Sequence, residues 1–305
     1  MATYNGEKYV EEQLKSILSQ TIRPDEIVIC DDCSTDKTVK VIENTLDGYN
    51  VNYLIIKNKS NLGSTISFEK SIKALDTEII FLSDQDDWWF SEKIQRYLDI
   101  FDSNEKIKLV FSNSEVTDSK LNCKKYSLWD TLDYNGNMII RQEIFKRNIF
   151  TGMCMAFKKE LLSDQFTIPK YMLHDEFVGW CGVIENAVFP LNEKLAKYRQ
   201  HSNNVVGVKN RSKFKSFSDL KMKNRMSSYK TKMKYLYLKN ISDDKILNLM
   251  IDEAIGFYDY RTSLYSLKKI EALLIFFKYC CDGSYKKFSS NTDNAKLKDF
   301  ISIIL

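Results

Sequence analysis

Ile79-Ile80-Phe81-Leu82-Ser83-Asp84-Gln85-Asp86-Asp87 is the stretch around which the chain is organised. A short apolar run, typical of a buried strand, ends in three carboxylates within four residues. Like charges this close repel one another unless a cation lies among them, and a divalent metal ion, which prefers oxygen ligands, meets that need. The alternative is a solvated acidic turn ahead of a helix that begins near Ser91.

The composition is that of a globular protein with a sizeable core. The 305 residues could form one large or two smaller domains, and 44% of them are hydrophobic. The net charge of +4 is small but unevenly spread. Residues 209–240 carry eleven Lys or Arg against the single acid Asp219, a local balance of +10.

The cysteines and the absence of long apolar runs favour a cytoplasmic protein. Seven cysteines in scattered contexts suit a reducing compartment better than a disulfide framework. Cys30 and Cys33 have no second pair at zinc-finger spacing, and the only histidines are His174 and His201, so zinc is not expected. The sequence shows neither a signal peptide nor an apolar run of the roughly 20 residues that a membrane span needs. We expect any membrane contact to be peripheral, at the inner face of the plasma membrane.

Apolar runs and amphipathic helices alternate at the start of the chain. Strands are predicted over 26–30, 51–57 and 79–83. Helices are predicted over 8–20 and 64–74, and a third helix between them is expected to be capped by Ser34 or Thr35. This alternation predicts an α/β fold with a doubly wound, mainly parallel sheet, in which ligands bind beyond the carboxyl ends of the strands. Asp31, Asn61 and 84–87 follow strand ends, so we expect them to share one crevice.

The rest of the chain divides into two parts. Further helices and strands are predicted over 92–102, 109–111, 153–157, 177–184 and 194–200, with the polar stretch 113–137 as an excursion over the site. From Lys209 the pattern changes to Lys, Tyr and Met at helical spacing, so we predict one domain over 1–208 and a basic, helical C-terminal region over 209–305. Asp175 lies at the start of a predicted helix. An acid there interacts favourably with the helix dipole, so a capping role explains Asp175 as well as a catalytic role does.

Six short motifs in this order and spacing resemble those of family 2 glycosyltransferases with the GT-A fold, closest to bacterial rhamnosyltransferase-like members. They are Ala2-Thr3-Tyr4-Asn5-Gly6, Asp31-Asp32-Cys33-Ser34-Thr35-Asp36, Asn61-Leu62-Gly63, Leu82-Ser83-Asp84-Gln85-Asp86-Asp87-Trp88, His174-Asp175 and Tyr198-Arg199-Gln200-His201. The resemblance implies an inverting enzyme that moves a single sugar, with rhamnose the best guess, from a nucleoside-diphosphate sugar to a hydroxyl of a cell-surface polysaccharide or lipid-linked glycan. A Gln-x-x-Arg-Trp motif of processive synthases is absent, which favours single transfer.

The resemblance implies a donor site for a dTDP- or UDP-sugar. The residues implied to bind this donor are Thr3, Tyr4, Asn5, Asp31, Asn61, Asp84 and Arg199. Asp31 would accept a hydrogen bond from a base N–H, and because a carboxylate only accepts, it would prefer uracil or thymine to cytosine. Arg199 is implied as a pyrophosphate clamp, with pairing to a core acid as the alternative. Asp32 is expected to stabilise a loop or cap a helix.

The resemblance also implies a divalent metal and a catalytic base. Asp86 is the expected principal ligand of Mn²⁺ or Mg²⁺, and His201 is a second candidate ligand, whose imidazole would favour Mn²⁺. The metal would neutralise charge on the departing nucleoside diphosphate. Asp175 matches the base that takes the proton of the acceptor hydroxyl. Contacts to the acceptor or donor sugar are implied for Asp87, Trp88, Gly152 and His174.

One departure from the family pattern keeps another function open. Family members place several apolar strand residues ahead of the Thr-Tyr-Asn motif, whereas this sequence starts at Met1, so most of the first strand is expected to be missing. A catalytically inactive glycan- or membrane-surface-binding protein is therefore an alternative. A sugar-1-phosphate nucleotidyltransferase is less favoured, because its Gly-rich phosphate loop is absent. The basic stretch 209–240 would bind an anionic membrane surface or form a solvated helical face, and no nucleic-acid-binding module accompanies it.

Overall fold

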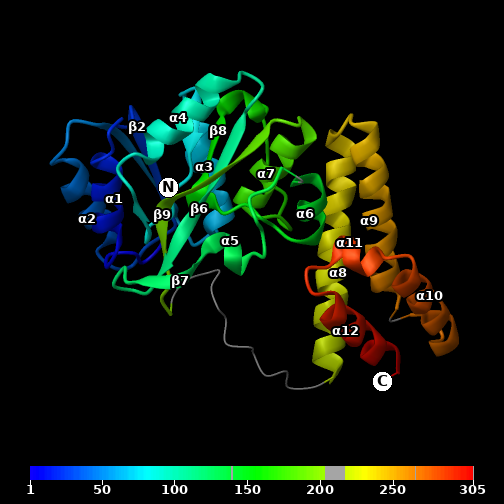
Figure 1. The fold of residues 1–305 in the computed structure, drawn as a ribbon. Helices are drawn as coiled ribbons and strands as arrows, with labels where there is room; N and C mark the ends of the chain where they lie inside the picture. The colour runs from blue at the N-terminus through cyan, green and yellow to red at the C-terminus, as the bar shows by residue number, and fades with distance from the viewer. Residues whose placement is uncertain (139, 203–216, 265, 305) are drawn as a thin grey trace. The chain divides into compact units, whose positions relative to one another are not determined.

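The computed structural model describes residues 1–138, 140–202, 217–264 and 266–304 (Figure 1). The chain forms two compact units. The α/β unit comprises Met1–Met138, Phe150–Ile168 and Leu173–Gly207, and the helical unit comprises Ile139–Ile149, Pro169–Met172 and Val208–Leu305. The predicted boundary at 208/209 lies outside the described residues. The two short earlier segments, which the sequence placed in the first domain, belong to the helical unit.

Three parallel strands form the first sheet, in the order β1 (Ala2–Thr3), β2 (Glu26–Asp31), β3 (Asn52–Lys57). All six residues of β2 pair with β3, whereas only Cys30 and Asp31 pair with β1. Helices α1 (Val10–Leu18), α2 (Thr38–Leu46) and α3 (Ser64–Ala74) alternate with these strands, as the hydrophobic pattern predicts. The predicted cap of α2 is wrong, because the helix begins at Thr38 and the hydroxyl of Ser34 donates to Asp31 instead.

The second sheet has six strands, in the order β4-β8-β6-β9-β5 with β7 beside β6. Their bounds are β4 (Ile79–Phe81), β5 (Trp88–Trp89), β6 (Leu109–Thr117), β7 (Cys123–Ser127), β8 (Met155–Lys158) and β9 (Val188–Arg199). Among these pairings β6 and β9 are parallel, and the others are antiparallel. The strands are therefore less uniformly parallel than the sequence predicts. A short turn, closed by the hydrogen bond from Asp118 N to Asn122 O, joins β6 to β7 without a helical crossover.

The polar stretch 113–137 is not only an excursion, because it contains the end of β6, all of β7 and helix α5 (Leu128–Thr131). Some polar side chains in and beside this stretch form hydrogen bonds inside the fold. The hydroxyl of Tyr97 donates to Ser112 at 2.7 Å, and the amide of Asn113 donates to Ser127 at 3.1 Å. A strand with buried, hydrogen-bonded polar residues lacks the apolar run that reveals strands in a sequence.

Helices α4 (Lys93–Ser103) and α7 (His174–Ile184) complete the α/β unit, with the 3₁₀ turns η1 (Gly152–Cys154) and η2 (Lys159–Leu161). Tyr97 and Phe101 of α4 pack with Val110, Ala156 and Leu195 from three strands of the second sheet. Full burial of side chains of this size contributes about 1.5–3 kcal/mol each. This packing holds the strand ends at which the candidate residues lie.

The helical unit contains α6 (Ile140–Lys146), α8 (Phe217–Ile241), α9 (Lys245–Ser263), α10 (Lys269–Cys281), α11 (Ser284–Phe288) and α12 (Thr292–Ile304). The ring of Phe145 in α6 stacks on Tyr235 in α8 at 5.4 Å, which explains why the segment around α6 belongs to this unit. Arg261 and Asp299 form a buried bidentate ion pair with N–O distances of 2.7 and 2.9 Å. No helix of the described residues has the length and apolar character to span a bilayer.

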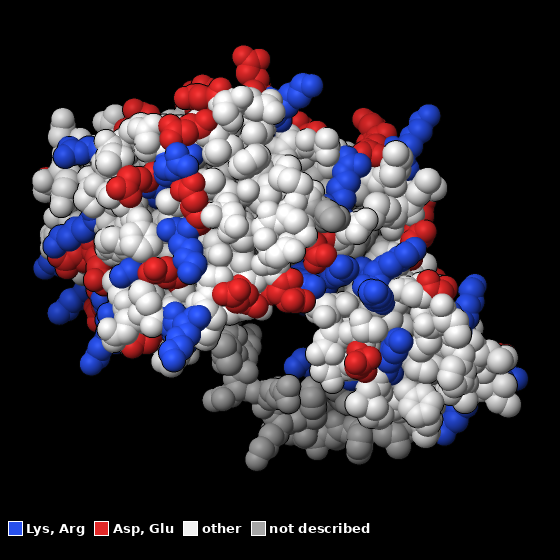
Figure 2. All heavy atoms as spheres, in the orientation of Figure 1, with Lys and Arg blue, Asp and Glu red and all other residues white. Residues whose placement is uncertain are grey.

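The basic stretch 209–240 is described only in part, because residues 209–216 lie outside the described residues. Its described portion is within α8, where Lys232 and Lys239 form salt bridges of 2.5 Å with Asp259 and Asp252 of α9. Part of the positive charge is therefore neutralised within the helical unit. Figure 2 shows basic and acidic side chains interspersed over the described part of the face in view, which agrees with the net charge of +4.

Candidate functional site

The ends of β1 and β2 form one wall of the candidate site. The carboxylate of Asp31, 3% exposed, accepts hydrogen bonds from the hydroxyl of Thr3 at 3.0 Å and from the backbone and hydroxyl of Ser34 at 2.8 and 2.6 Å. A carboxylate has about four acceptor positions, so one remains for a ligand. The ring of Tyr4, next to it in sequence, is 45% exposed and can lie against a base.

Asn5 and Asp32 shape the loops around this wall. Asn5 has a φ of 46°, in the left-handed region that Asn tolerates, and its side-chain oxygen accepts from the backbone of Thr35 at 2.8 Å. The carboxylate of Asp32 accepts from the backbone N–H groups of Leu62 and Gly63 at 2.8 and 2.7 Å. Although burial opposes it, these hydrogen bonds hold the pKa of Asp32 below its usual value. Asn61 lies exposed on the loop that Asp32 holds.

The acidic loop after β4 forms the opposite wall. Burial raises the pKa of Asp84 to about 7, and the carboxylates of Asp86 and Asp175 raise it in the same direction. Asp175, which comes from the distant helix α7, is therefore within electrostatic range of Asp84. Their carboxylates are at least partly buried, so the loop is not the solvated acidic turn that the sequence left as an alternative.

Asp86 and His201, the two residues expected to bind a metal, are in direct contact. The Nε2 atom of His201 lies 2.8 Å from Oδ2 of Asp86, and its ring stacks on Tyr9 with centroids 4.6 Å apart. The described residues contain no group of three or more His, Cys, Asp or Glu side chains that could hold a metal ion alone. The adjacent oxygen and nitrogen atoms, beside the crowded acid Asp84, nevertheless fit a divalent ion that takes further ligands from a diphosphate.

Arg199 supports the acidic loop from within the protein. Its side chain is 3% exposed, its Nε donates to the backbone oxygen of Asp86 at 2.7 Å, and its guanidinium pairs with Glu12 at 2.5 Å. Its backbone N–H donates to Asp87 at 2.9 Å. Arg199 therefore pairs with an acid, although Glu12 is about half exposed and is not the core acid that the alternative expected, and the pyrophosphate clamp stays a prediction.

Asp87 lies differently from the sugar contact that the resemblance implies, whereas Trp88 remains partly exposed. Asp87 is fully buried, so its carboxylate is not accessible to a sugar in this structure, and it orients the loop through Arg199. Burial raises the pKa of Asp87 well above its usual value. The ring of Trp88 is half-buried, with Nζ of Lys197 5.3 Å from its centroid.

His174 and Gly152 meet beside the start of α7. His174 is 7% exposed and stacks on Phe68 at 3.7 Å, and burial lowers its pKa to about 3, so the imidazole is neutral. Neither of its ring nitrogens has a hydrogen-bond partner among the described residues. A Cβ at residue 152 would lie 2.7 Å from His174 Nε2, so the close approach requires Gly152. Oδ1 of Asp175 accepts from the backbone of Glu176 at 2.6 Å.

Sequence reasoning missed several residues that position the site. Gln85 contacts Tyr4 from between the acids of the acidic loop. Lys93 is buried, donates to the backbone oxygen of Met153, and lies 4.0 Å from the Trp89 ring centroid. Burial lowers the pKa of Lys93 to about 8, and the remaining charge partly offsets those of Asp84 and Asp87. A lysine at the start of a helix carries no sequence signal for such a role.

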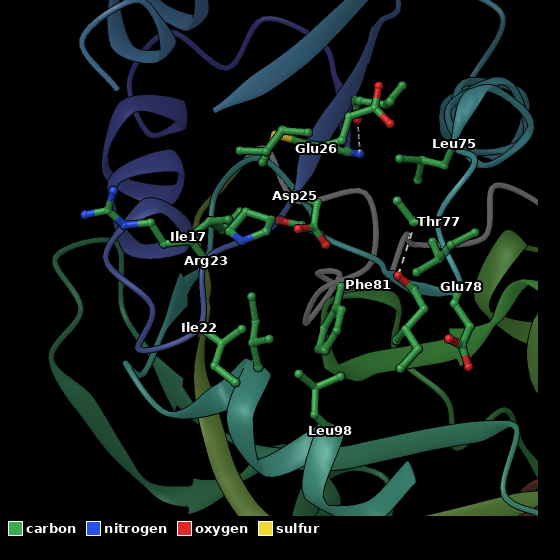
Figure 3. A pocket seen from close by; sticks show the side chains of 18 of the residues that line it. Ile17, Ile22, Arg23, Asp25, Glu26, Leu75, Thr77, Glu78, Phe81 and Leu98 are labelled. Atoms are coloured by element: carbon green, nitrogen blue, oxygen red, sulfur yellow. Dashed lines mark hydrogen bonds between the residues drawn. The ribbon is translucent and has the colours of Figure 1, made fainter. Parts of the chain in front are cut away.

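The α/β unit also contains a cavity of about 310 Å³, which differs from this site in the residues that line it (Figure 3). Its wall is mostly apolar, with Ile17, Phe81 and Leu98 among the residues that line it, while Arg23 and Glu78 are charged. None of the candidate acids Asp31, Asp84, Asp86 or Asp175 lines it. An apolar wall of this kind suits hydrocarbon groups and not a diphosphate, so we do not place the donor there.

Comparison with known sequences supports the resemblance. The sequence model described as "Glycosyl transferase family 2" matches residues 1–166. The dTDP-rhamnosyl transferase RfbG of Shigella flexneri is 32% identical over 222 residues, which cover 68% of this chain and 74% of that protein. The UDP-Glc:alpha-D-GlcNAc-diphosphoundecaprenol beta-1,3-glucosyltransferase WfaP of Escherichia coli is 24% identical over 216 residues, covering 68% of this chain and 79% of that protein.

Solved structures share the fold. The S. aureus TarS 1–349 structure in complex with UDP-GlcNAc has a TM-score of 0.57 and 18% identity, covering 100% of this chain and 80% of that chain. A mannosyltransferase from Pyrobaculum calidifontis in complex with GDP-Man and Mn²⁺ has a TM-score of 0.55 and 15% identity, covering 99% and 84%. The GT-A α/β fold with a helical C-terminal region, predicted from the sequence, is confirmed.

Proposed function

Because the chain belongs to glycosyltransferase family 2, we propose that it moves one sugar from a nucleoside-diphosphate sugar to an acceptor hydroxyl, with inversion at the anomeric carbon. The observation that carries this proposal is that Asp84 and Asp86 lie on one loop, where Oδ2 of Asp86 is 2.8 Å from His201 and Asp175 is close enough to raise the pKa of Asp84. These acids lie next to the loop of Tyr4, because Gln85 hydrogen bonds to it. One place can therefore hold a nucleotide, a diphosphate and a hydroxyl acceptor.

The donor's pyrimidine base is proposed to lie between Tyr4 and Asp31. The remaining acceptor position of the Asp31 carboxylate would receive the base N–H, and Thr3 keeps that carboxylate oriented by its hydrogen bond. Asn5 contributes through the loop, since its side chain already holds Thr35. Asp84 is proposed to face the ribose and the sugar. Asn61 is proposed to contact the donor from its exposed loop.

Asp175 is the proposed catalytic base. The acceptor oxygen forms a bond to the anomeric carbon as the bond to the nucleoside diphosphate breaks, and the carboxylate takes the hydroxyl proton. His174, which is neutral and whose ring nitrogens have no hydrogen-bond partner within the described part of the chain, is proposed to contact a sugar hydroxyl beside the base. Gly152 leaves the space for this imidazole. Trp88 is proposed to contact the apolar face of the sugar ring. Asp87 is proposed to orient the acidic loop and not to contact the sugar.

Asp86 and His201 are the proposed ligands of Mn²⁺ or Mg²⁺. When bound, such an ion neutralises the negative charge that develops on the departing diphosphate. Arg199 holds the backbone at Asp86 in place, and the stacked ring of Tyr9 supports His201. These contacts orient the two side chains in advance, which reduces the entropy lost on binding.

Rhamnose is the proposed donor sugar, because a relative that is 32% identical is named a dTDP-rhamnosyl transferase. We expect turnover with dTDP-rhamnose and Mn²⁺ to exceed that with UDP-glucose or UDP-galactose, and EDTA to abolish it. Release of the nucleoside diphosphate with each donor measures this. Absence of hydrolysis and transfer with every donor, despite nucleotide binding, would favour the inactive glycan-binding alternative. Formation of a nucleotide sugar from a sugar 1-phosphate would instead favour a nucleotidyltransferase.

A glycan on a lipid carrier is the proposed acceptor, and the helical unit is proposed to bind an anionic membrane surface. Met222, Met226 and Tyr229 of α8 are exposed at helical spacing, and the neighbouring Arg225 and Lys230 are exposed as well. We expect co-sedimentation with vesicles that contain phosphatidylglycerol, weakened by salt, and none with phosphatidylcholine alone. Equal recovery in the supernatant with both vesicles would contradict the membrane contact.

A further inference from the structure

Gln85 connects the two walls of the candidate site. The backbone N–H of Tyr4 donates to its Oε1 at 2.9 Å, and its Nε2 donates to the backbone oxygen of Tyr4 at 3.1 Å. The side-chain amide thus pairs with a single residue through both a donor and an acceptor, as a neighbouring strand would. Two such bonds set both the distance and the orientation of Tyr4 relative to the acidic loop.

Gly6 provides the space that this pairing needs. A Cβ at residue 6 would lie 2.1 Å from Oε1 of Gln85 and 2.5 Å from its Cδ. These atoms are the far end of a flexible side chain, so an alanine at position 6 would displace Gln85 and leave the backbone in place. Gly6 also forms a local turn, because its backbone oxygen accepts from Tyr9 and Val10, and it packs against a residue 79 positions away.

The contacts continue on both sides of Gln85. The neighbours of Tyr4 are Thr3, which hydrogen bonds Asp31, and Asn5, whose backbone N–H donates to Ser34 at 2.9 Å. The neighbours of Gln85 are Asp84 and Asp86, and Asp86 contacts His201. Gln85 therefore lies between the proposed base-binding wall and the proposed metal-binding wall.

We propose that Gln85 is a positioning residue that couples the nucleoside end of the donor site to its metal end. The proposal rests on the proposed function of these two walls. An ion bound at Asp86 restricts the acidic loop, and Gln85 transmits that restriction to Tyr4, so each ligand raises the affinity for the other by the same factor. This coupling is distinct from the direct bridge that a diphosphate makes to a metal.

The test uses nucleosides, because uridine and thymidine lack the phosphates that would bridge to a metal. Equilibrium dialysis with labelled nucleoside measures affinity with saturating Mn²⁺ and with EDTA. We expect Mn²⁺ to raise the affinity of the parent chain by about fivefold or more. In Gln85→Ala the Mn²⁺ effect should disappear, and affinity in EDTA should fall by about tenfold, because the loop no longer stays in its binding position.

Gly6→Ala tests the same contact from the other side. We expect it to reproduce the loss of the Mn²⁺ effect, and the double variant to be no worse than either single variant, because all three lack one contact. Gln95→Ala is the matched control, since Gln95 is a partly exposed glutamine on α4 that hydrogen bonds only to Asp99 among the described residues. It should keep the full Mn²⁺ effect.

Two results would overturn the coupling. One is a Gln85→Ala chain that binds nucleoside and metal with the parent's Mn²⁺ effect, and the other is a double variant in which the losses add. Both leave the proposed function intact, because they presuppose binding at both ends. A parent chain that binds neither nucleoside nor Mn²⁺ would contradict the proposed donor site itself, and the coupling with it.

Discussion

Asp175→Asn is expected to lower the rate of sugar transfer by about 10²–10⁴-fold, the usual contribution of a positioned general base. The substitution keeps the size of the side chain and an oxygen that can accept from the backbone of Glu176, so the start of α7 should stay intact. An amide cannot take the acceptor proton at neutral pH. Single-turnover transfer from a radiolabelled donor measures the rate of the chemical step without product release.

The affinity for the donor nucleotide should change by less than about twofold in Asp175→Asn, because Asp175 acts on the acceptor side. Glu176→Gln is the matched control, since Glu176 is the next acid on the same helix turn. It should transfer sugar at nearly the parent rate. Normal turnover in Asp175→Asn would show that this acid only caps α7 and that the base lies elsewhere.

Asp86→Ala is expected to remove the metal-dependent part of nucleotide binding and to lower transfer by at least about 10²-fold, because a bound metal ion contributes several kcal/mol of charge stabilisation. It removes the carboxylate that contacts His201 at 2.8 Å. Titration of UDP and dTDP in the presence of Mn²⁺ and in the presence of EDTA separates the metal-dependent part of nucleotide binding from the metal-independent part. In the variant the affinity with Mn²⁺ should equal the affinity with EDTA.

Asp102→Ala is the control for general loss of negative charge, since Asp102 is exposed at the end of α4. It should keep the Mn²⁺ effect and the melting temperature of the parent. The backbone oxygen of residue 86 still accepts from Arg199 in Asp86→Ala, so this variant should fold as well. Undiminished metal-dependent nucleotide binding in Asp86→Ala would assign the metal to other residues.

The regular elements of the α/β unit follow from local sequence. The runs 26–30 and 79–83 are continuous enough in apolar residues to indicate strands, and α3 begins at Ser64 and ends at Ala74 as its helical spacing predicts. β6 could not be predicted in full, because buried polar residues such as Ser112 and Asn113 find hydrogen-bond partners only after the chain has folded. β7 was missed because its residues are mostly exposed and show no apolar run. Strand direction also depends on which elements pair, and local patterns carry no information on pairing.

The candidate site shows the same division between local and tertiary information. Motif resemblance proposed Asp31, Asp86 and Asp175, which lie at the end of β2, in the loop after β4 and in the first turn of α7. It did not reveal that Arg199 pairs with Glu12, 187 residues away in the chain, or that Asp87 is buried. Charged side chains have many possible partners, and solvent access, which decides among them, is a property of the folded chain.

The acidic stretch 84–87 summarises the difference. The sequence by itself determined that three acids follow a buried strand and that a cation or a turn must account for them. Only the tertiary structure decided that Asp175 comes within electrostatic range of Asp84, that Asp86 contacts His201, and that Gln85 hydrogen bonds to Tyr4. The physical reason is distance, because electrostatic and hydrogen-bond interactions act over a few ångströms and the fold alone brings these residues within that range.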